Sequence, residues 1–367
     1  MEQKLFCSCC NRAIGGEKTV YMVHGETICE DCADEKTAVC DRCGERVWSD
    51  ETESDGDITL CNSCYDNYYT SCEICGAIIN NDYINYDDED RPFCDICYDK
   101  HCGSIHNYGY KPKPVFYGDG DRFFGVELEI DKGGKLNKNA ELILADGNYS
   151  RENIYIKSDG SLDDGMEIVS HPMTLNYHTN YMPWQDVLET AARLGYRSHK
   201  TNTCGLHIHV NKKSLGDTQQ LQEERISRIL YFVEHHWEEL LKFSRRTEYQ
   251  MNKWAARYGY KNDPAEMIEH AKKHGNGRYS CVNITNYDTI EFRMFRGTLK
   301  LNSLIAAIQL VDIICEMAIT FGDDEIKSIG WTEFVESIDT DAYPELITYF
   351  KERRLYVNEP IESEEDI

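Results

Sequence analysis

The 367-residue sequence has no uninterrupted apolar run near the roughly 18 residues that a membrane-spanning helix needs. Its first residues, MEQKLFCSCC, also lack the basic, apolar and small-residue regions of a signal peptide. We therefore expect a cytoplasmic protein without a membrane partner. Basic residues are scarce: 39 Lys and Arg stand against 65 Asp and Glu, a formal net charge of −26. Because nucleic-acid binding relies on clustered cations, we also expect no nucleic-acid partner.

Cysteine, by contrast, is abundant at one end of the chain. Fourteen of the 17 cysteines lie in residues 1–102, where three C-x₂-C…C-x₂-C units, at about 7–32, 40–64 and 72–97, repeat every 32 or 33 residues. Two such knuckles complete a closed tetrahedral Cys₄ site, so the spacing predicts three structural zinc ions. The predicted ligands are Cys7, Cys10, Cys29, Cys32, Cys40, Cys43, Cys61, Cys64, Cys72, Cys75, Cys94 and Cys97.

The cysteine pattern leaves some alternatives open. A disulfide framework is the rival to zinc, although it suits a secreted chain better. The links between units allow one zinc per repeat, while a cross-braced pairing between neighbouring repeats is the other possibility. Cys9 and Cys102 are left over. The units resemble LIM-type and related zinc ribbons. A closed Cys₄ site has no open position for catalysis, which favours a structural or partner-docking role.

The remaining chain divides by composition. Residues 103–121, rich in Gly, Pro and Tyr, read as a linker, 122–355 as a second domain, and 356–367 as a disordered acidic tail. In the second domain, apolar periodicity predicts one long helix from Asp217 or Thr218 to about Arg245, and a buried one over 303–321. Pro264 and Pro344 mark the first turns of two more helices.

Four segments of this domain alternate apolar residues with ionisable ones: GVELEID, GMEIVS, GLHIHV and TIEFRMF. Because strand side chains alternate between faces, each segment has a core face and a polar face. The polar residues are Glu127, Glu129, Glu167, His207, His209, Glu291 and Arg293. Carboxylates with an imidazole among them favour Mg²⁺ or Mn²⁺, and an arginine on the same wall favours bound phosphate. Taken singly, these patterns are also typical of solvated strand faces or in-strand salt bridges.

The segments GVELEID, KSDGSLDDGMEIVSHPMT, TCGLHIHV and RYSCVNITNYDTIEFRMFRGTLKLNSLIAAIQLVDIICEM, in that order over residues 122–320, resemble the amidoligase family. These carboxylate–amine ligases are related to glutamine synthetase and glutamate–cysteine ligase. The resemblance implies an α+β domain whose curved, mostly antiparallel sheet is glutamine synthetase-like, with flanking helices. In this chain the domain is preceded by the small zinc-ribbon repeats.

The resemblance also implies roles for individual residues. Glu127, His207 and Glu291 would hold a metal near the phosphates of ATP. Glu129 and Glu167 would hold a second metal near the acid substrate. Arg293 would stabilise the transferring phosphoryl group, assisted by Arg278 or Arg296. The substrate side would be formed by Asp159, Ser161 and His209, with Asp159 or Asp131 accepting a proton from the amine.

The implied activity is an ATP-dependent ligation of an acid to an amine through an acyl phosphate, with ATP, Mg²⁺ or Mn²⁺ and about three Zn²⁺ as cofactors. The identity of both substrates stays open and includes a peptide or protein. The zinc repeats would recruit a substrate or partner. Two alternatives are a metal-dependent hydrolase using the same His/Glu wall, and a non-enzymatic zinc-ribbon adaptor.

Overall fold

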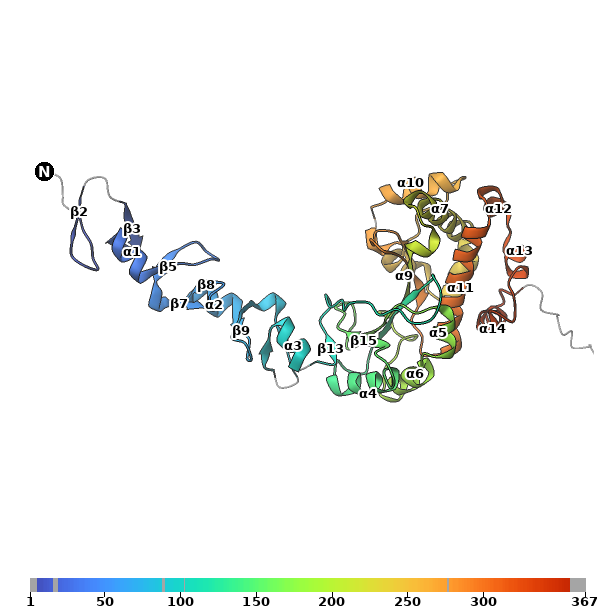
Figure 1. Cartoon of the computed structure of the whole chain (residues 1–367), viewed down its shortest axis with the longest axis horizontal. Coiled ribbons are helices and arrows are strands. Elements are labelled where there is room, and N and C mark those ends of the chain that lie inside the picture. Colours follow the sequence, from blue (N-terminus) through green and yellow to red (C-terminus); the bar gives the residue numbers. More distant parts are fainter. Residues whose placement is uncertain (1–4, 16–18, 88–89, 102, 276, 357–367) are drawn as a thin grey trace, which may run out of the picture. The chain divides into compact units, whose positions relative to one another are not determined.

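The computed structural model describes residues 5–15, 19–87, 90–101, 103–275 and 277–356. The chain forms two compact units, Met1–Gly103 and Ser104–Ile367, and each is described by itself (Figure 1). The boundary agrees closely with the expected end of the zinc repeats. Cys102 and nearly all of the expected acidic tail lie outside the described residues.

The first unit repeats one arrangement of two short hairpins and a seven-residue helix. The first repeat contains β1 (Leu5–Phe6), β2 (Ala13–Ile14), β3 (Val20–Val23), β4 (Glu26–Cys29) and α1 (Glu30–Lys36). The second contains β5 (Thr37–Val39), β6 (Arg46–Trp48), β7 (Thr52–Ser54), β8 (Thr59–Cys61) and α2 (Asn62–Tyr68), with η1 (Ser49–Glu51) between its hairpins. The third contains β9 (Tyr69–Ser71), β10 (Ile78–Asn80), β11 (Asn85–Tyr86), β12 (Pro92–Phe93) and α3 (Asp95–His101), with η2 (Asn81–Tyr83).

Each first hairpin turns in the same way around its C-x₂-C pair. Asn11, Gly44 and Gly76 directly follow the second cysteine, and their φ angles of 58°, 73° and 72° lie in the left-handed region. Glycine and asparagine adopt that region at the lowest cost. The three N–H groups donate to the carbonyl of the first cysteine of the pair at 2.8, 2.8 and 2.9 Å. The chain thus builds one knuckle three times.

The repeats have three separate small cores, each packed around its own cysteines. Trp48 of the second repeat packs against the first core, and Ile78 of the third packs against the second. Each of these two cores is therefore completed by a side chain from the repeat that follows it.

The second unit contains a seven-stranded sheet in the order β13-β15-β16-β14-β17-β19-β18. Its strands are β13 (Ile105–His106), β14 (Phe124–Ile130), β15 (Ile154–Lys157), β16 (Met166–Ser170), β17 (Gly205–Asn211), β18 (Val282–Asn283) and β19 (Thr289–Arg296). All neighbours pair antiparallel except β13 and β15. The mixed helix-and-sheet class is confirmed. The segment interpreted as a linker contributes the edge strand β13, whose Ile105 is buried in the core.

Helices surround the sheet in this unit. They are α4 (Asn137–Gly147), α5 (Leu175–Asn180), α6 (Trp184–Arg193), α7 (Gln219–His235), α8 (Trp237–Ser244), α9 (Glu248–Trp254), α10 (Pro264–Lys273), α11 (Leu301–Thr320), α12 (Asp323–Ser328), α13 (Trp331–Glu336) and α14 (Pro344–Glu352), with η3 (Lys212–Leu215) and η4 (Gly277–Tyr279). By length and composition α11 is able to cross a membrane, which we had not expected of any segment. However, 72% of its apolar window is buried inside the protein, as in the core helix of a soluble domain.

The predicted helix from residue 218 to 245 is two helices, so that prediction was wrong in its length. Thr218 caps α7 by accepting a hydrogen bond from the Leu221 N–H, as expected. The helix then breaks at His236, which has φ −103° and ψ 34°. The imidazole of His236 is buried, with ring centroids 4.5 Å from Phe232 and 5.7 Å from Trp331. The buried His236 side chain thus packs at the point where the chain changes direction between α7 and α8.

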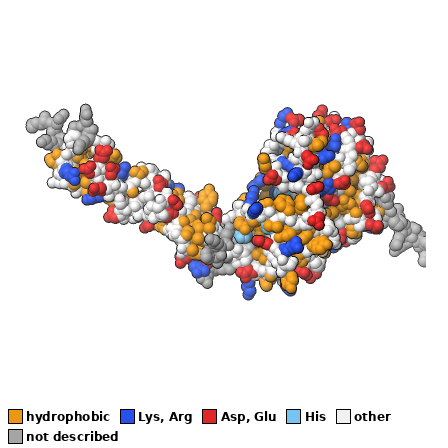
Figure 2. Space-filling view, viewed as in Figure 1, with side chains coloured by type: hydrophobic (Ala, Val, Ile, Leu, Met, Phe, Trp, Pro, Cys, Tyr) orange, Lys and Arg blue, Asp and Glu red, His pale blue; other side chains and the backbone are white. Residues whose placement is uncertain are grey.

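Several arginines of the second unit are paired with acids. Arg122 bridges Asp312 and Glu316 at 2.6 and 2.9 Å, and Arg257 contacts Glu234 at 2.9 Å. On the face of this unit seen in Figure 2, basic and acidic side chains are interspersed. Such pairing is the expected state of a cation in a protein with an excess of acids.

Candidate active site

The strand register brings the predicted polar residues onto one face of the sheet. Glu127 on β14 lies opposite His207 on β17, and Glu129 lies opposite Glu167 on β16. His209 on β17 lies opposite Glu291 on β19. The apolar residues between them, including Val126, Leu128 and Ile208, face the core and are fully buried. The alternation read from the sequence is thus realised in each of these strands.

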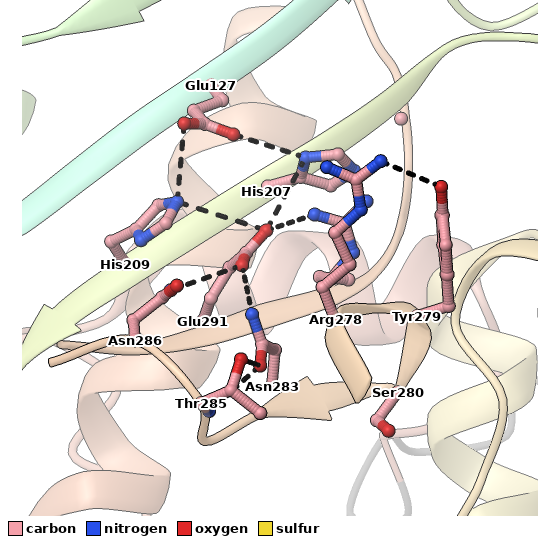
Figure 3. Close-up of polar contacts among 12 residues, drawn as sticks. Glu127, His207, His209, Arg278, Tyr279, Ser280, Asn283, Thr285, Asn286 and Glu291 are labelled. Carbon is pink, nitrogen blue, oxygen red and sulfur yellow. Dashed lines mark hydrogen bonds and ion pairs between the residues drawn. The ribbon is translucent and has the colours of Figure 1, made fainter. Parts of the chain in front are cut away.

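A first cluster consists of Glu127, His207 and Glu291, whose ligand atoms all lie within 4.8 Å of one another. The His207 Nδ1 atom is 3.4 Å from Glu127 Oε2 and 3.8 Å from Glu291 Oε1. His209 approaches from the other side, with Nε2 3.4 Å from Glu127 Oε1 and 3.9 Å from Glu291 Oε1 (Figure 3). His209, expected on the substrate side, instead lies in the wall of this cluster.

A second cluster consists of Glu129, Glu167 and again His207, with ligand atoms within 4.8 Å of one another. All three residues are buried. Lys157 on β15, a residue that the sequence reasoning missed, forms an ion pair with Glu167 at 3.0 Å. Its position directly opposite Glu167 follows from the register of β15 and β16. The structure thus brings together the residues predicted for each of two metal sites, and it adds His207 to the second set.

Burial and mutual repulsion shift the pKa values of the carboxylates in the two clusters. Burial raises the pKa of Glu167 well above its ordinary value, and the charge of Glu127 raises it further, against the opposing effect of Lys157. Burial also raises the pKa of Glu129. Burial acts in the same direction on Glu127, but the nearby histidines outweigh it and lower the pKa overall. Buried like charges of this kind are stabilised by a cation, and their oxygen-rich donor set fits Mg²⁺ or Mn²⁺.

Glu291 is held by a network of donors. Asn283 donates to its Oε2 at 2.9 Å and Asn286 at 3.3 Å, as Figure 3 shows. Arg293 pairs with its Oε1. The Nε–H of Arg293 is buried without a hydrogen-bond partner among the described residues. The guanidinium therefore retains a donor for a further anionic group.

Gly205 marks a point where three site residues converge. A Cβ atom there would lie 2.3 Å from Arg246 Nη2, 2.8 Å from His207 Nε2 and 3.3 Å from Glu129 Oε2. The Gly205 N–H also donates to Glu129 Oε2. Arg246, which follows α8 in the chain, thus reaches the second cluster. Nothing in the local sequence links Arg246 to β17, so only the folded chain shows this contact.

Asp131 anchors the loop before β16. Its carboxylate is fully buried and accepts hydrogen bonds from the N–H groups of Asp163 and Asp164 at 3.1 and 2.7 Å, and from Thr203 Oγ1 at 2.6 Å. Burial alone would raise its pKa, but these donors lower it. This carboxylate is fully engaged, which disfavours Asp131 as a proton acceptor. Asp159 in the same loop is half-buried and accepts from the Ser161 N–H at 2.6 Å.

The two assisting arginines lie in different places. Arg278, in η4, is exposed and donates to Tyr108 and Tyr279 hydroxyls at 2.8 and 2.9 Å. Figure 3 shows its contact with Tyr279. Arg296, at the end of β19, instead lines a separate cavity with Arg245 and Arg246. Tyr108 belongs to the segment taken for a linker, so sequence reasoning did not place it near the site.

The twelve repeat cysteines gather as four per repeat in sequential order, each set with sulfurs within 4.8 Å of one another. The distance between sulfurs is 3.7 Å for Cys10–Cys29, and the corresponding distances in the second and third repeats are 3.9 and 3.6 Å. A tetrahedral zinc with bonds of about 2.3 Å separates its sulfurs by about 3.8 Å. No described cysteine is in a disulfide. The geometry fits one zinc per repeat.

Comparison with known proteins finds a similarity between part of this chain and one protein family. Residues 142–315 match the family model described as "Putative amidoligase enzyme". No curated protein matches the chain. The bifunctional glutathione synthetase from Pasteurella multocida is similar at 14% identity over 63% of this chain and 46% of that chain, with a TM-score of 0.34. A structure described as "Apo GmaS without ligand" is similar at 14% identity over 64% of this chain and 68% of that one, also with a TM-score of 0.34.

This chain spans less than half of the glutathione synthetase chain. The match to the family model covers the segment that contains most residues of the candidate site. Glu167, His207, Glu291 and Arg293 all lie within residues 142–315, whereas β14 lies before them. Over residues 142–315, a little under half of its length, the chain is similar to the amidoligase family.

Proposed function

We propose that the second unit is an ATP-dependent carboxylate–amine ligase with a glutamine synthetase-like fold. The observation that carries the proposal is the pair of ligand clusters that share His207, with Arg293 beside Glu291. Carboxylates for two cations and a guanidinium for phosphate oxygens, on one sheet face, are the groups that phosphoryl transfer requires. Amide-bond formation is the activity that the family description supports.

The residues of the two clusters fit divalent cations. Glu127, His207 and Glu291 would hold one Mg²⁺ or Mn²⁺, and Glu129 and Glu167 the other. Such ions supply charge neutralisation for the phosphate oxygens. Lys157, which pairs with Glu167, would place a further positive charge beside the second cation.

In the proposed reaction an oxygen of the acid's carboxylate attacks the γ-phosphorus of ATP, and ADP leaves with the electrons of the broken P–O bond. The amine nitrogen then attacks the acyl carbon, and inorganic phosphate leaves. Arg293 holds the transferring phosphoryl group, Arg278 is within reach of the nucleotide side, and Asp159 accepts the proton that the amine loses. Ser161 fixes Asp159 through its N–H.

The zinc repeats have no open coordination position and serve, in this proposal, to recruit a substrate or partner protein. The function would be cytoplasmic, where thiolates stay reduced. A metal-dependent hydrolase using the same wall would need no ATP, and a non-enzymatic adaptor would need neither ATP nor the buried acids.

The test is ADP release from ATP and Mg²⁺ by the full chain, supplied with a cell extract as a source of acids and amines. Glu291→Gln and Arg293→Ala should each abolish the extract-stimulated release. Glu269→Gln removes an exposed acid paired with Lys272 and should leave it unchanged. Failure of the folded, zinc-loaded protein to bind or turn over ATP would refute the ligase and bring forward the hydrolase or the adaptor.

A further inference from the structure

A cavity of about 690 Å³ adjoins the second cluster and is lined by cations. Five basic side chains contribute to it: Lys242 from α8, Arg245 and Arg246 after it, Arg296 from β19 and Arg353 after α14. We call this cavity the cationic pocket. A single carboxylate, that of Glu238, is among the lining residues.

These cations are held in place without a close ion pair, although Arg246 lies near the carboxylate of Glu129. Within the described part of the chain, none of the five forms an ion pair with a carboxylate at 4.0 Å or less. They are held by backbone carbonyls instead: Arg246 Nε donates to the Phe295 carbonyl at 3.1 Å, and Arg296 Nη1 to the Arg245 carbonyl at 3.3 Å. Likewise Arg353 Nη2 donates to the Lys242 carbonyl at 3.2 Å. This differs from Arg122, Arg228 and Arg257, which all pair with acids.

The positive charges of the pocket also act on the imidazole of His199. Burial lowers the pKa of His199, and the nearby Arg245 and Arg296 lower it further, to about 4. The neutral imidazole therefore accepts a hydrogen bond from Arg245 at 3.1 Å. The Nε–H groups of Arg296 and Arg353 are buried without a hydrogen bond among the described residues. In a chain with 65 acids, five gathered cations that form no ion pair among the described residues indicate a site for an external anion.

The lining indicates which kind of anion fits. Among the described residues that line the pocket, Leu241 is the one apolar side chain, and the single ring is the imidazole of His199; Phe, Tyr and Trp are absent from this lining. A nucleotide base would find no Phe, Tyr or Trp ring to stack on there, and the His199 imidazole is already bonded to Arg245, whereas a compact ligand with several charges would meet several donors. Arg246 joins the pocket to the site, because its Nη2 lies at the convergence of His207 and Glu129 near Gly205. An acid whose reacting carboxylate lies at the second cluster would extend its remaining groups into the pocket.

We propose that the cationic pocket binds the non-reacting part of the acid substrate, and that this acid carries several further carboxylates. The inference rests on the proposed function and deepens it. The shared chemistry is a group of clustered carboxylates, which a small polycarboxylic acid or an acidic peptide both supply. The five cations match such a ligand, whereas a monocarboxylate would leave most of them unpaired.

Titration calorimetry on the full chain tests this without ATP or turnover. The probes are tricarballylate, a penta-glutamate peptide, inorganic tripolyphosphate and acetate, all at one ionic strength. Lys242→Gln and Arg353→Gln should each weaken binding of tricarballylate or the peptide about tenfold. Lys272→Gln removes the same charge from an exposed ion pair with Glu223 and should change nothing. Binding of only one of these two probes identifies the source of the carboxylates.

Two results would overturn the inference. The first is that neither polycarboxylate binds. The second is that the pocket variants weaken the binding of tripolyphosphate alone, which would assign the pocket to the nucleotide. The proposed function fails separately. If the ligase is active but Lys242→Gln leaves the KM for its acid unchanged, the pocket assignment falls and the ligase stands. If the pocket binds polycarboxylates as described but ATP is never consumed, the ligase falls and the polyanion site stands.

Discussion

Gly205→Ala tests the convergence of site residues with a single methyl group. The added Cβ would lie 2.3 Å from Arg246 Nη2 and 2.8 Å from His207 Nε2, both far inside van der Waals contact. The φ angle of Gly205 is not in the left-handed region, so alanine meets no backbone strain there. Either the imidazole or the guanidinium has to move. Because His207 belongs to both ligand clusters, its displacement affects both cations.

The expected magnitude follows from two known costs. Displacing a group that orients metal ligands weakens metal binding about 10- to 100-fold. Overpacking a buried position costs about 1–3 kcal/mol of unfolding free energy, and the end of the Arg246 side chain can give way more easily than backbone. We therefore expect a metal-binding defect in a protein that still folds. The measurements are Mn²⁺ titration followed by electron paramagnetic resonance, and denaturant unfolding.

Gly125→Ala is the matched control, because it adds the same methyl group on the neighbouring strand β14. There the nearest atom to the new Cβ is His209 Cβ at 3.6 Å, an ordinary contact. This variant should bind Mn²⁺ as the wild type does. Equal Mn²⁺ affinity in the two alanine variants would refute the reasoning that Gly205 leaves the space in which the ligand sets meet.

Other predictions concern the scaffold. Zinc determination with a colorimetric chelator should give about three ions per chain, and about two for Cys43→Ser; an unchanged zinc content would contradict the second site. Asp131→Asn should lower the unfolding free energy by roughly 2 kcal/mol, because an amide cannot accept all the hydrogen bonds that the carboxylate accepts; equal denaturant midpoints would count against its anchoring role. Burial lowers the pKa of His178 to about 4. Because an unfolded histidine titrates near 6.5, the unfolded state binds more protons between these values, and the unfolding free energy should fall by roughly 3 kcal/mol as the pH drops from 6.5 to 4. His178→Gln keeps a donor for the Phe124 carbonyl and an acceptor for Trp184, and should lose most of this slope in tryptophan-monitored unfolding.

The sequence alone was sufficient to predict which side chains share one face of each strand. The alternation in GVELEID or TIEFRMF fixes which residues share a face, and the structure places those faces together. The register between strands was not available from the sequence, because it depends on pairing between segments far apart in the chain. Lys157 illustrates the difference: it ends a short strand with no recognisable pattern, and only its pairing with Glu167 shows its place in the site.

Residues that act across tertiary contacts were missed for the same reason. Arg246 follows a helix and reaches β17 through the packing of α8 against β19. Tyr108 lies in a segment whose Gly and Pro content indicated a linker, yet that segment contributes β13 and reaches Arg278. In the first unit, strict local spacing was enough to predict which twelve cysteines gather in sets of four. It did not decide how the knuckles pair, which the folded hairpins and helices determine.

The packing of Trp48 into the first core and of Ile78 into the second has a consequence for how the array is made on the ribosome. Chains emerge from the N-terminus first, and domains fold as their last residues appear. The first zinc site has its fourth ligand at Cys32, but its core lacks Trp48 until another sixteen residues have been synthesised. Each repeat would therefore mature one step behind translation. A stall or truncation within the array would leave the last finished repeat with an open core, exposed to oxidation or to the wrong metal.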